Sequence, residues 1–242
     1  MEDLRQFLQA FKGRKVLMVI YPHPDDETMA AGGLLMVAKR LGYQTVVVCL
    51  TEGEAGQNYS GSWDRRLADI RREELNRAGK ILGVDVLEHG DFGDGKLRGN
   101  EKGWSLWVSK QLKKYDPGIV VTYDHSGNTG HPDHIILSVR VLEIVKRMKK
   151  PPVFLWTSLF GIVRRRMLSQ KVAEFGSVPN FFLDLGWKAV RKGLAARAHR
   201  SQKPGKDLPV PLLVLFLIFR REWYYQVDLK KRYLYKFVDF KI

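Results

Sequence analysis

The stretch from Lys15 to Glu27, KVLMVIYPHPDDE, decides the fold. Lys15–Tyr21 is an apolar run of the kind that a parallel strand buried on both faces shows. The run ends abruptly in an acid-and-histidine cluster, His23–Glu27. Charged residues at the exit of a buried strand are poorly explained by packing, whereas a metal bound by imidazole and carboxylate explains them well. The stretch therefore predicts a parallel strand that leads directly into a metal site.

Strand-like and helix-like segments alternate along the first part of the chain. Further apolar runs typical of buried strands are Gln44–Leu50, Val84–Leu87, Gly118–Tyr123 and Val153–Leu159. The segments between them that carry helical patterns are Glu27–Leu41, Trp63–Leu82, Gly103–Tyr115 and Pro132–Met148. Hydrophobic strands that alternate with helices indicate a mostly parallel sheet covered by helices. We therefore predict an α/β fold, a Rossmann-like three-layer sandwich with a basic C-terminal elaboration.

The length of 242 residues suits a single domain. We expect residues 1–160 to form the α/β core that carries the site, and residues 161–242 to complete the domain. In the second part, Leu185–Arg200 is expected to be a helix and Glu222–Val227 a strand. The apolar run Val210–Phe219 is interpreted mainly as a core strand, with a buried helix segment or contact with a membrane surface as alternatives.

The net charge of +15 is concentrated in the C-terminal part. Residues 1–139 contain 18 Lys+Arg and 19 Asp+Glu, a net of −1, whereas residues 140–242 contain 23 Lys+Arg and 7 Asp+Glu, a net of +16. This asymmetry suggests an anionic partner such as anionic lipid, a phosphorylated substrate or nucleic acid, with a solvated basic surface as the alternative. Arg164–Arg166 motivates the nucleic-acid hypothesis, but the basic residues are dispersed and no nucleic-acid-binding motif is recognisable.

Cysteine usage and the N-terminus bear on the cellular compartment. The single cysteine, Cys49, excludes an internal disulfide and a cysteine-rich zinc site, and its place in an apolar run is typical of a buried, inert thiol. The acidic start Met1–Leu4 has no apolar segment of the signal-peptide kind, and no run reaches the roughly 18 apolar residues that a bilayer span needs. We expect a cytoplasmic protein, with peripheral contact at the inner face of the membrane as an open alternative.

A second acid-and-histidine cluster, His131–His134 (HPDH), follows the strand that is predicted to end at Tyr123. In parallel α/β sheets, ligands bind at the carboxyl ends of the strands, near the point where the strand order reverses. Topology alone therefore brings this cluster and His23–Glu27 to one edge of the sheet. A single His-x-x-His pair is a weak signal, but two clusters at strand ends, each with proline in second place, are hard to explain without a functional site.

The spacing within the two clusters predicts a set of metal ligands. His23 and Asp26 are three residues apart, and so are His131 and His134, so each pair can face one point at the start of a helix. Pro24 is expected in the first turn of its helix. Two imidazoles and one carboxylate, with a position left for water, are the composition of a catalytic zinc site.

Three residues of the clusters remain beside this predicted metal site. Asp25 is a free carboxylate and therefore a candidate general base. His131 is available to stabilise an oxyanion, and Asp133 is expected to orient its ring through the other ring nitrogen. The residues thus predict a metal-dependent hydrolase.

The two clusters and several further stretches carry a resemblance to a known family. The chain resembles the PIG-L/LmbE-like N-acetylglucosaminyl deacetylases, in which a Pro-His-Pro-Asp-Asp-Glu segment and a His-Pro-Asp-His segment build a zinc site. The other similar stretches are Thr51–Gly56, Arg71–Leu75 leading into Ile81–Val84, Asp94–Gly95 and His199–Gln202. The resemblance spans residues 14–225, nearly the whole chain.

The resemblance implies a role for each matching residue. The metal ligands that it implies are His23, Asp26 and His134. It implies that Asp25 is the general base and that His131 stabilises the tetrahedral intermediate. It also places Arg71 and Asp94 among the substrate-binding groups, with a solvent-facing arginine and an ordinary turn acid as the alternative interpretations.

Several other residues near the motifs carry separate expectations. Thr129 stands two residues before the second cluster, where some relatives have a tyrosine that assists the oxyanion, so the resemblance does not imply this assistance here. His125 is a minor alternative ligand, and His89 is expected at the surface. His199 is expected to support the structure beside Gln202 rather than to bind metal.

The implied reaction is metal-assisted hydrolysis of an N-acetyl group, which gives acetate and a free amino sugar. Zinc is the expected metal, and Fe(II) would accept the same ligands. The basic C-terminal part and Val210–Phe219 favour an N-acetylglucosamine substrate that is anionic or lipid-linked, with contact to an anionic membrane. Hydrolysis of a different acylamine, or a non-catalytic module that binds a glycan or an anionic ligand, are the alternatives.

Overall fold

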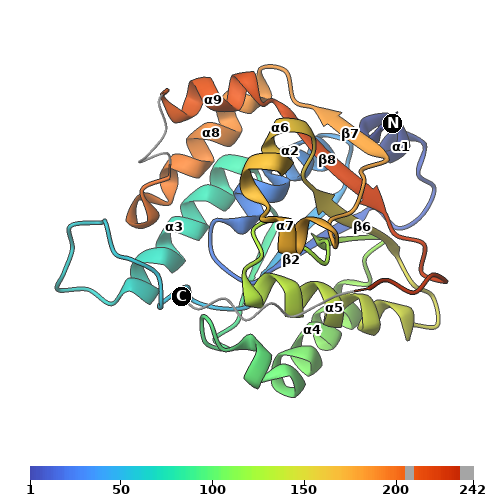
Figure 1. Cartoon of the computed structure of the whole chain (residues 1–242), viewed down its shortest axis with the longest axis horizontal. Helices are drawn as coiled ribbons and strands as arrows, with labels where there is room; N and C mark the ends of the chain where they lie inside the picture. The colour runs from blue at the N-terminus through green and yellow to red at the C-terminus, as the bar shows by residue number, and fades with distance from the viewer. Residues whose placement is uncertain (205–209, 235–242) are drawn as a thin grey trace.

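A single mixed sheet crosses the molecule (Figure 1). The computed structural model describes residues 1–204 and 210–234, and within them the sheet has eight strands. The strands are β1 (Glu2–Asp3), β2 (Val16–Tyr21), β3 (Gln44–Cys49), β4 (Val86–His89), β5 (Ile119–Tyr123), β6 (Val153–Ser158), β7 (Phe181–Asp184) and β8 (Arg221–Gln226). Their order is β1-β7-β8-β6-β5-β2-β3-β4, and only β8 runs antiparallel to its neighbours, β6 and β7.

Helices cover both faces of the sheet, and each face has its own hydrophobic core. The helices whose buried side chains belong to the first core are α1 (Leu4–Ala10), α2 (Asp26–Arg40), α3 (Leu67–Leu82), α8 (Lys188–Ala198) and α9 (Leu212–Ile218). Those of the second core are α4 (Glu101–Tyr115) and α5 (Pro132–Lys146). The shorter segments are α6 (Gly161–Met167), α7 (Gln170–Ala173), and the 3₁₀ turns η1 (Leu97–Gly99) and η2 (Arg200–Gln202). The predicted three-layer α/β architecture is confirmed.

The sheet topology fixes where a ligand site can form. Strand β2 pairs with β3 on one side and with β5 on the other, so the chain winds in opposite directions from this point. The carboxyl ends of β2 and β5 then border one crevice, which is the usual ligand position in open α/β sheets. The loops that leave these two strands carry the two acid-and-histidine clusters.

Two predicted elements differ from the structure. Val210–Phe219 was expected mainly as a core strand, but residues 212–218 form the helix α9, which packs on α8 where Gly193 lets Leu213 approach closely. Helix α3 begins at Leu67 rather than at Trp63. The loop before it contains two turns, in which side-chain oxygens of Asn58 and Ser60 accept hydrogen bonds from backbone N–H groups two residues further on. Strand β7 and helix α1 were not predicted.

A buried ion pair holds helix α2 against the C-terminal part of the chain. Lys192 of α8 and Glu222 of β8 lie 2.6 Å apart, and both side chains are almost fully buried. The Glu222 carboxylate also accepts the backbone N–H groups of Gly33 and Leu34, and the Lys192 ammonium donates to the carbonyl of Met29. The C-terminal part therefore helps to position the helix that begins at the first cluster.

In the described residues, no helix combines the length and apolarity needed to cross a bilayer.

Candidate functional site

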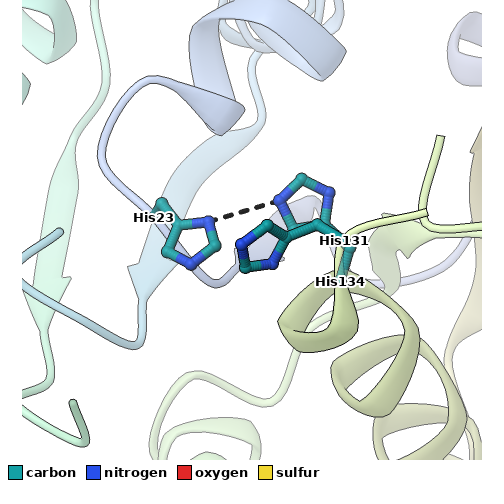
Figure 2. A group of neighbouring side chains, drawn as sticks. All are labelled: His23, His131 and His134. Carbon is teal, nitrogen blue, oxygen red and sulfur yellow. Dashed lines mark hydrogen bonds between the residues drawn. The ribbon is translucent and has the colours of Figure 1, made fainter. Parts of the chain in front are cut away.

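The two clusters meet at the crevice beside β2 and β5. His23 lies in the turn after β2, and Asp26 is the first residue of α2. His131 caps the amino end of α5, with Pro132 as its first residue, and His134 lies in its first turn. Figure 2 shows the three imidazole rings turned toward one another from these two segments.

The turn that contains the first cluster differs from the prediction in where the helix begins. Pro24 was expected in the first helical turn, but Pro24 and Asp25 form a tight turn before α2 begins. Asp25 has a φ of 108°, a left-handed backbone conformation that aspartate and asparagine tolerate better than most side chains. This turn still points His23 and Asp26 at a common position, as the three-residue spacing predicts.

The predicted ligand atoms form a compact triangle. His23 Nδ1 lies 3.2 Å from His134 Nε2 (Figure 2), and Asp26 Oδ2 lies 3.5 Å from each of these nitrogens. Ligand atoms that hold a metal tetrahedrally at 2.0–2.2 Å are separated by roughly 3.3–3.6 Å. The three edges therefore match one face of a tetrahedral site, and the donor set of two imidazoles and one carboxylate suits Zn²⁺ or Fe²⁺.

Each of the two imidazoles is also fixed by a partner on its other ring nitrogen. His23 Nε2 lies 2.9 Å from Asp94 Oδ1 and 3.2 Å from Asp133 Oδ2. His134 Nδ1 lies 2.8 Å from the Gly127 carbonyl, so its proton is on Nδ1 and Nε2 is free to accept a metal. Outer hydrogen bonds of this kind fix the tautomer and orientation of metal-binding histidines.

Two other groups of side chains could also hold an ion. The ligand atoms of His23, His131 and His134 all lie within 4.8 Å of one another, and so do those of His23, Asp94 and Asp133. The second group is already joined by hydrogen bonds to His23 Nε2. In the first group, His131 takes the place of Asp26 beside the same two histidines, so it is the competitor of Asp26 as third ligand.

His131 is held in one protonation form by its position at the helix start. Its Nδ1 accepts the backbone N–H of Asp133, so the proton of the neutral ring is on Nε2. Burial lowers the pKa of His131, and the nearby charge of His23 lowers it further. The ring is therefore neutral at neutral pH and offers an Nε2–H donor, as the predicted oxyanion role requires.

The structure corrects the predicted role of Asp133. Its carboxylate was expected to orient His131, but it accepts hydrogen bonds from the backbone N–H groups of Gly95 and Leu97 and contacts His23 Nε2. The loop that contains η1 lies over the start of α5 and turns this side chain inward, so Asp133 orients His23 instead.

The two predicted substrate-binding residues, Asp94 and Arg71, form hydrogen bonds with other groups of the protein. Asp94 contacts His23 and accepts the backbone N–H of Ala55. Arg71 is buried, with 4% of its surface exposed, and donates to the carbonyls of Gly53 and Pro24. Neither side chain is a solvent-facing surface residue, and sugar contact by either one stays a prediction.

Asp25, the predicted general base, lies beside Arg71. Its Oδ2 is 3.4 Å from Arg71 Nη2. Burial raises the pKa of Asp25 to about 6. The charge of Arg71 opposes this effect but is outweighed by burial, and the charge of Asp26 raises the pKa further. A carboxylate with a pKa near neutrality can accept a proton from water and later return it.

A second buried pair holds the backbone at Asp25. Glu27 accepts the backbone N–H of Asp25 through Oε2, at 3.0 Å, and its Oε1 lies 3.2 Å from His199 Nε2. The His199 side chain therefore pairs with Glu27, and the backbone N–H of Gln202 donates to the His199 carbonyl, so the two residues also lie beside each other as expected. Gln202 donates to the Gln57 carbonyl and the Ser201 hydroxyl.

Negative charge is in surplus around the imidazoles. Burial alone would lower the pKa of His23, but its hydrogen bonds with Asp133, Asp26 and Asp94 outweigh burial and raise this pKa well above its usual value. Burial, together with the charge of His23, lowers the pKa of His134 to about 4. A divalent cation in the triangle would meet the same surplus of carboxylates, which supports a resident metal ion.

The remaining residues that carried expectations lie outside the triangle. His125 is buried against Trp156, with its Nδ1 3.0 Å from the Leu234 carbonyl, and it belongs to none of the ion-binding groups. His89 is partly buried at the end of β4, near Asn76. Thr129 Oγ1 lies 3.4 Å from His134 Nδ1, a long contact compared with that of the Gly127 carbonyl.

The prediction from sequence missed Tyr123, which supports two of the candidate ligands. Its hydroxyl donates to Asp26 Oδ1 at 2.7 Å, and its ring stacks on the His134 ring with centroids 4.4 Å apart. The only signal in the sequence was a hydroxyl-bearing aromatic residue at the end of a strand that leads to the site.

Tyr123→Phe keeps the stacked ring and removes only the hydrogen bond to Asp26. We expect metal affinity to fall about 10- to 100-fold, the usual cost of losing an outer-sphere hydrogen bond. Competition with a metal-binding dye measures this change. Tyr43→Phe is the matched control, because it removes a buried hydroxyl that donates to the Leu8 carbonyl outside the site. An equal change in both variants would contradict a specific role of Tyr123.

Comparison with known proteins identifies similar chains. A family model described as PIG-L: GlcNAc-PI de-N-acetylase matches residues 18–145. Diacetylchitobiose deacetylase of Thermococcus kodakarensis is 30% identical, over 81% of this chain and 73% of that protein. A 1D-myo-inositol 2-acetamido-2-deoxy-alpha-D-glucopyranoside deacetylase of Mycolicibacterium vanbaalenii is 28% identical, over 77% of this chain and 80% of that protein. The solved structure of N,N'-diacetylchitobiose deacetylase from Pyrococcus horikoshii superposes with a TM-score of 0.72 at 22% identity, covering 98% of this chain and 94% of that chain.

Proposed function

Because the chain belongs to the PIG-L family of deacetylases, we propose that its site removes the acetyl group from an N-acetylglucosamine unit by metal-assisted hydrolysis. The chain is a hydrolase, and its relatives act on acetylated amino sugars. The observation that carries the mechanism is the triangle formed by His23, Asp26 and His134, because its edges of 3.2, 3.5 and 3.5 Å suit a tetrahedral ion.

We propose Zn²⁺ as the resident ion, held by the three side chains of the triangle, with Fe²⁺ as the alternative. When bound, the ion would polarise the acetamide carbonyl and lower the pKa of a water molecule. Tyr123, Asp94, Asp133 and the Gly127 carbonyl hold the three ligand side chains in place. This support orients the ligands before any substrate binds.

The chain's own groups then carry the protons. Asp25 accepts a proton from the attacking water, since its pKa of about 6 leaves the carboxylate mostly ionised at neutral pH. The attack on the carbonyl carbon leaves an oxyanion on the acetyl oxygen, and the Nε2–H of His131 donates to it. The C–N bond then breaks, the protonated Asp25 passes its proton to the leaving nitrogen, and the products are acetate and the amine.

Substrate class and location are proposed from the relatives and from charge. Three relatives are named as deacetylases of diacetylchitobiose, of an N-acetyl-glucosaminyl malate and of a 2-acetamido-2-deoxy-glucopyranoside, so we propose an N-acetylglucosamine conjugate as the substrate. The excess positive charge after residue 139 favours an anionic or lipid-linked conjugate. We propose that the protein acts in the cytoplasm.

Acetate release tests the proposed function directly. Metal-analysed protein is incubated with N-acetylglucosamine, N,N'-diacetylchitobiose and a lipid-linked N-acetylglucosaminide, and with an N-acetylated amino acid as a non-sugar acylamine. Release from one or more of the sugars, and not from the amino acid, is the expected result. Release from the amino acid alone would contradict the substrate class. Bound metal without any turnover would favour a module that only binds its ligand.

A further inference from the structure

The outer surface of α8 and α9 exposes apolar side chains that nothing in the described chain covers. The exposed fractions are 83% for Trp187, 45% for Leu194, 42% for Val214, 63% for Ile218 and 46% for Phe219. We call these five residues the α8–α9 face. Exposed apolar residues are ordinary when they are scattered singly, but a group of them on one surface marks a site of interaction.

The five side chains belong to one continuous surface. Helices α8 and α9 pack against each other at Gly193 and lie together at one side of the molecule (Figure 1). Trp187, the N-cap of α8, is seven residues or about two helical turns before Leu194, and Val214 and Ile218 are one turn apart on α9. The backbone N–H of Leu185 donates to the Arg220 carbonyl, which joins the start of α8 to the end of α9. Trp187 therefore belongs to the same end of the helix pair as Ile218 and Phe219.

Cations surround the face, and acidic side chains are scarce there. Of the residues that the structure describes between 188 and 221, none is acidic, and the exposed cations are Arg191, Arg197, Arg200, Lys203, Arg220 and Arg221. Lys192 is buried against Glu222 and does not contribute to the charge of the face. Arg191 and Arg197 are exposed on α8 beside the apolar residues. The nearest acid at the strand ends, Asp184, already pairs with both Arg220 and Arg221. The charge around the face is thus strongly positive.

A cleft of about 670 Å³ opens beside the face, between α3 and α8. Its lining residues are Arg77, Ile81, Leu194, Arg197, Ala198 and Arg200. The lining thus combines three guanidinium groups with three apolar side chains. Leu194 belongs both to the cleft and to the α8–α9 face. Guanidinium groups bind phosphate oxygens well, and apolar walls suit the hydrocarbon next to a headgroup.

We propose that the α8–α9 face docks the protein on an anionic membrane surface, with headgroup phosphates taken by the arginine-lined cleft. Apolar side chains inserted into the interface and cations near anionic headgroups are the two contributions that peripheral attachment needs. A second copy of this chain fits less well, because a two-fold contact through the face would bring the same cations against each other. A nucleic acid would leave the exposed tryptophan and isoleucine without an apolar partner. This proposal does not depend on the deacetylase activity.

Vesicle flotation with the full chain tests the proposal. We expect the protein to float with phosphatidylcholine vesicles that contain phosphatidylglycerol, and not with phosphatidylcholine alone. Trp187→Ser combined with Ile218→Ser should weaken vesicle partition about tenfold or more, since both side chains are exposed and their loss removes the inserted apolar area. Leu106→Ser is the matched control, because Leu106 is 58% exposed on α4 and belongs to the opposite layer.

Charge reversal gives an independent measurement on the same face. Arg191→Glu with Arg197→Glu should weaken partition into anionic vesicles roughly thirtyfold or more. Lys110→Glu on α4 is the matched control and should retain most of the binding. Absence of flotation with anionic vesicles at low salt would overturn the proposal, and so would equal losses in the controls. If sedimentation showed that Trp187→Ser/Ile218→Ser converts a dimer to a monomer without any vesicle binding, the face would belong to a second copy and the proposal would fail.

Discussion

Asp25→Asn is expected to lower turnover by about 10²–10⁴ and to leave the metal content unchanged. This is the range for removing a general base, because an amide cannot accept the proton of the attacking water. Asp25 itself forms none of the edges of the ligand triangle, so the ion should bind as before. Acetate release measures turnover, and atomic emission measures the metal.

Asparagine is a suitable replacement for structural reasons. The φ of 108° at this position is a conformation that asparagine tolerates nearly as well as aspartate. The backbone N–H that donates to Glu27 is retained, so the turn should keep its shape. Asp91→Asn, at an exposed acid outside the triangle, is the matched control and should keep full turnover. Full turnover in Asp25→Asn, with an unchanged melting temperature, would move the base to another residue.

The fold was largely predictable because a buried parallel strand leaves a strong pattern. Strand β2 was predicted from Lys15–Tyr21 and observed at Val16–Tyr21, and the strands next to it were found by the same kind of apolar run. The failures come from apolar runs whose burial is set by tertiary contacts. Val210–Phe219 is as apolar as a core strand, but its packing against Gly193 of α8 selects a helix, and this contact cannot be inferred from spacing.

In the candidate site too, some features follow from the sequence pattern and others depend on tertiary contacts. Spacing predicted that His23, Asp26 and His134 converge, because turns at the carboxyl ends of adjacent parallel strands must meet. Spacing could not predict which side chains form hydrogen bonds with the ligands and hold them in place. Tyr123 and Asp133 act through side-chain directions that depend on the exact crossing of β5, α5 and the loop at η1.

A variant of Asp26 distinguishes the two possible ligand sets, which share His23 and His134 and differ in having Asp26 or His131 as the third ligand. Asp26→Asn retains the size of the side chain and an oxygen for the Tyr123 hydroxyl, but it removes the negative charge that faces the two imidazoles. We expect metal affinity to fall beyond the ~100-fold that loss of an outer hydrogen bond causes, because a ligand itself is lost. Turnover should fall at least as far as in Asp25→Asn, and excess metal should restore part of it. No excess of metal should rescue Asp25→Asn, so the two variants separate binding of the ion from transfer of the proton.

His131→Ala provides the contrasting measurement for the same choice. If Asp26 is the third ligand, His131→Ala should keep its metal and lose turnover, because only the donor to the oxyanion is gone. If His131 is the third ligand, the pattern reverses, and Asp26→Asn keeps its metal while His131→Ala loses it. The triangle edges of 3.2, 3.5 and 3.5 Å favour the first result. The surplus of carboxylates around His23 favours it too, since a set of three neutral imidazoles would leave the negative charge of Asp26 next to the ion without coordinating it.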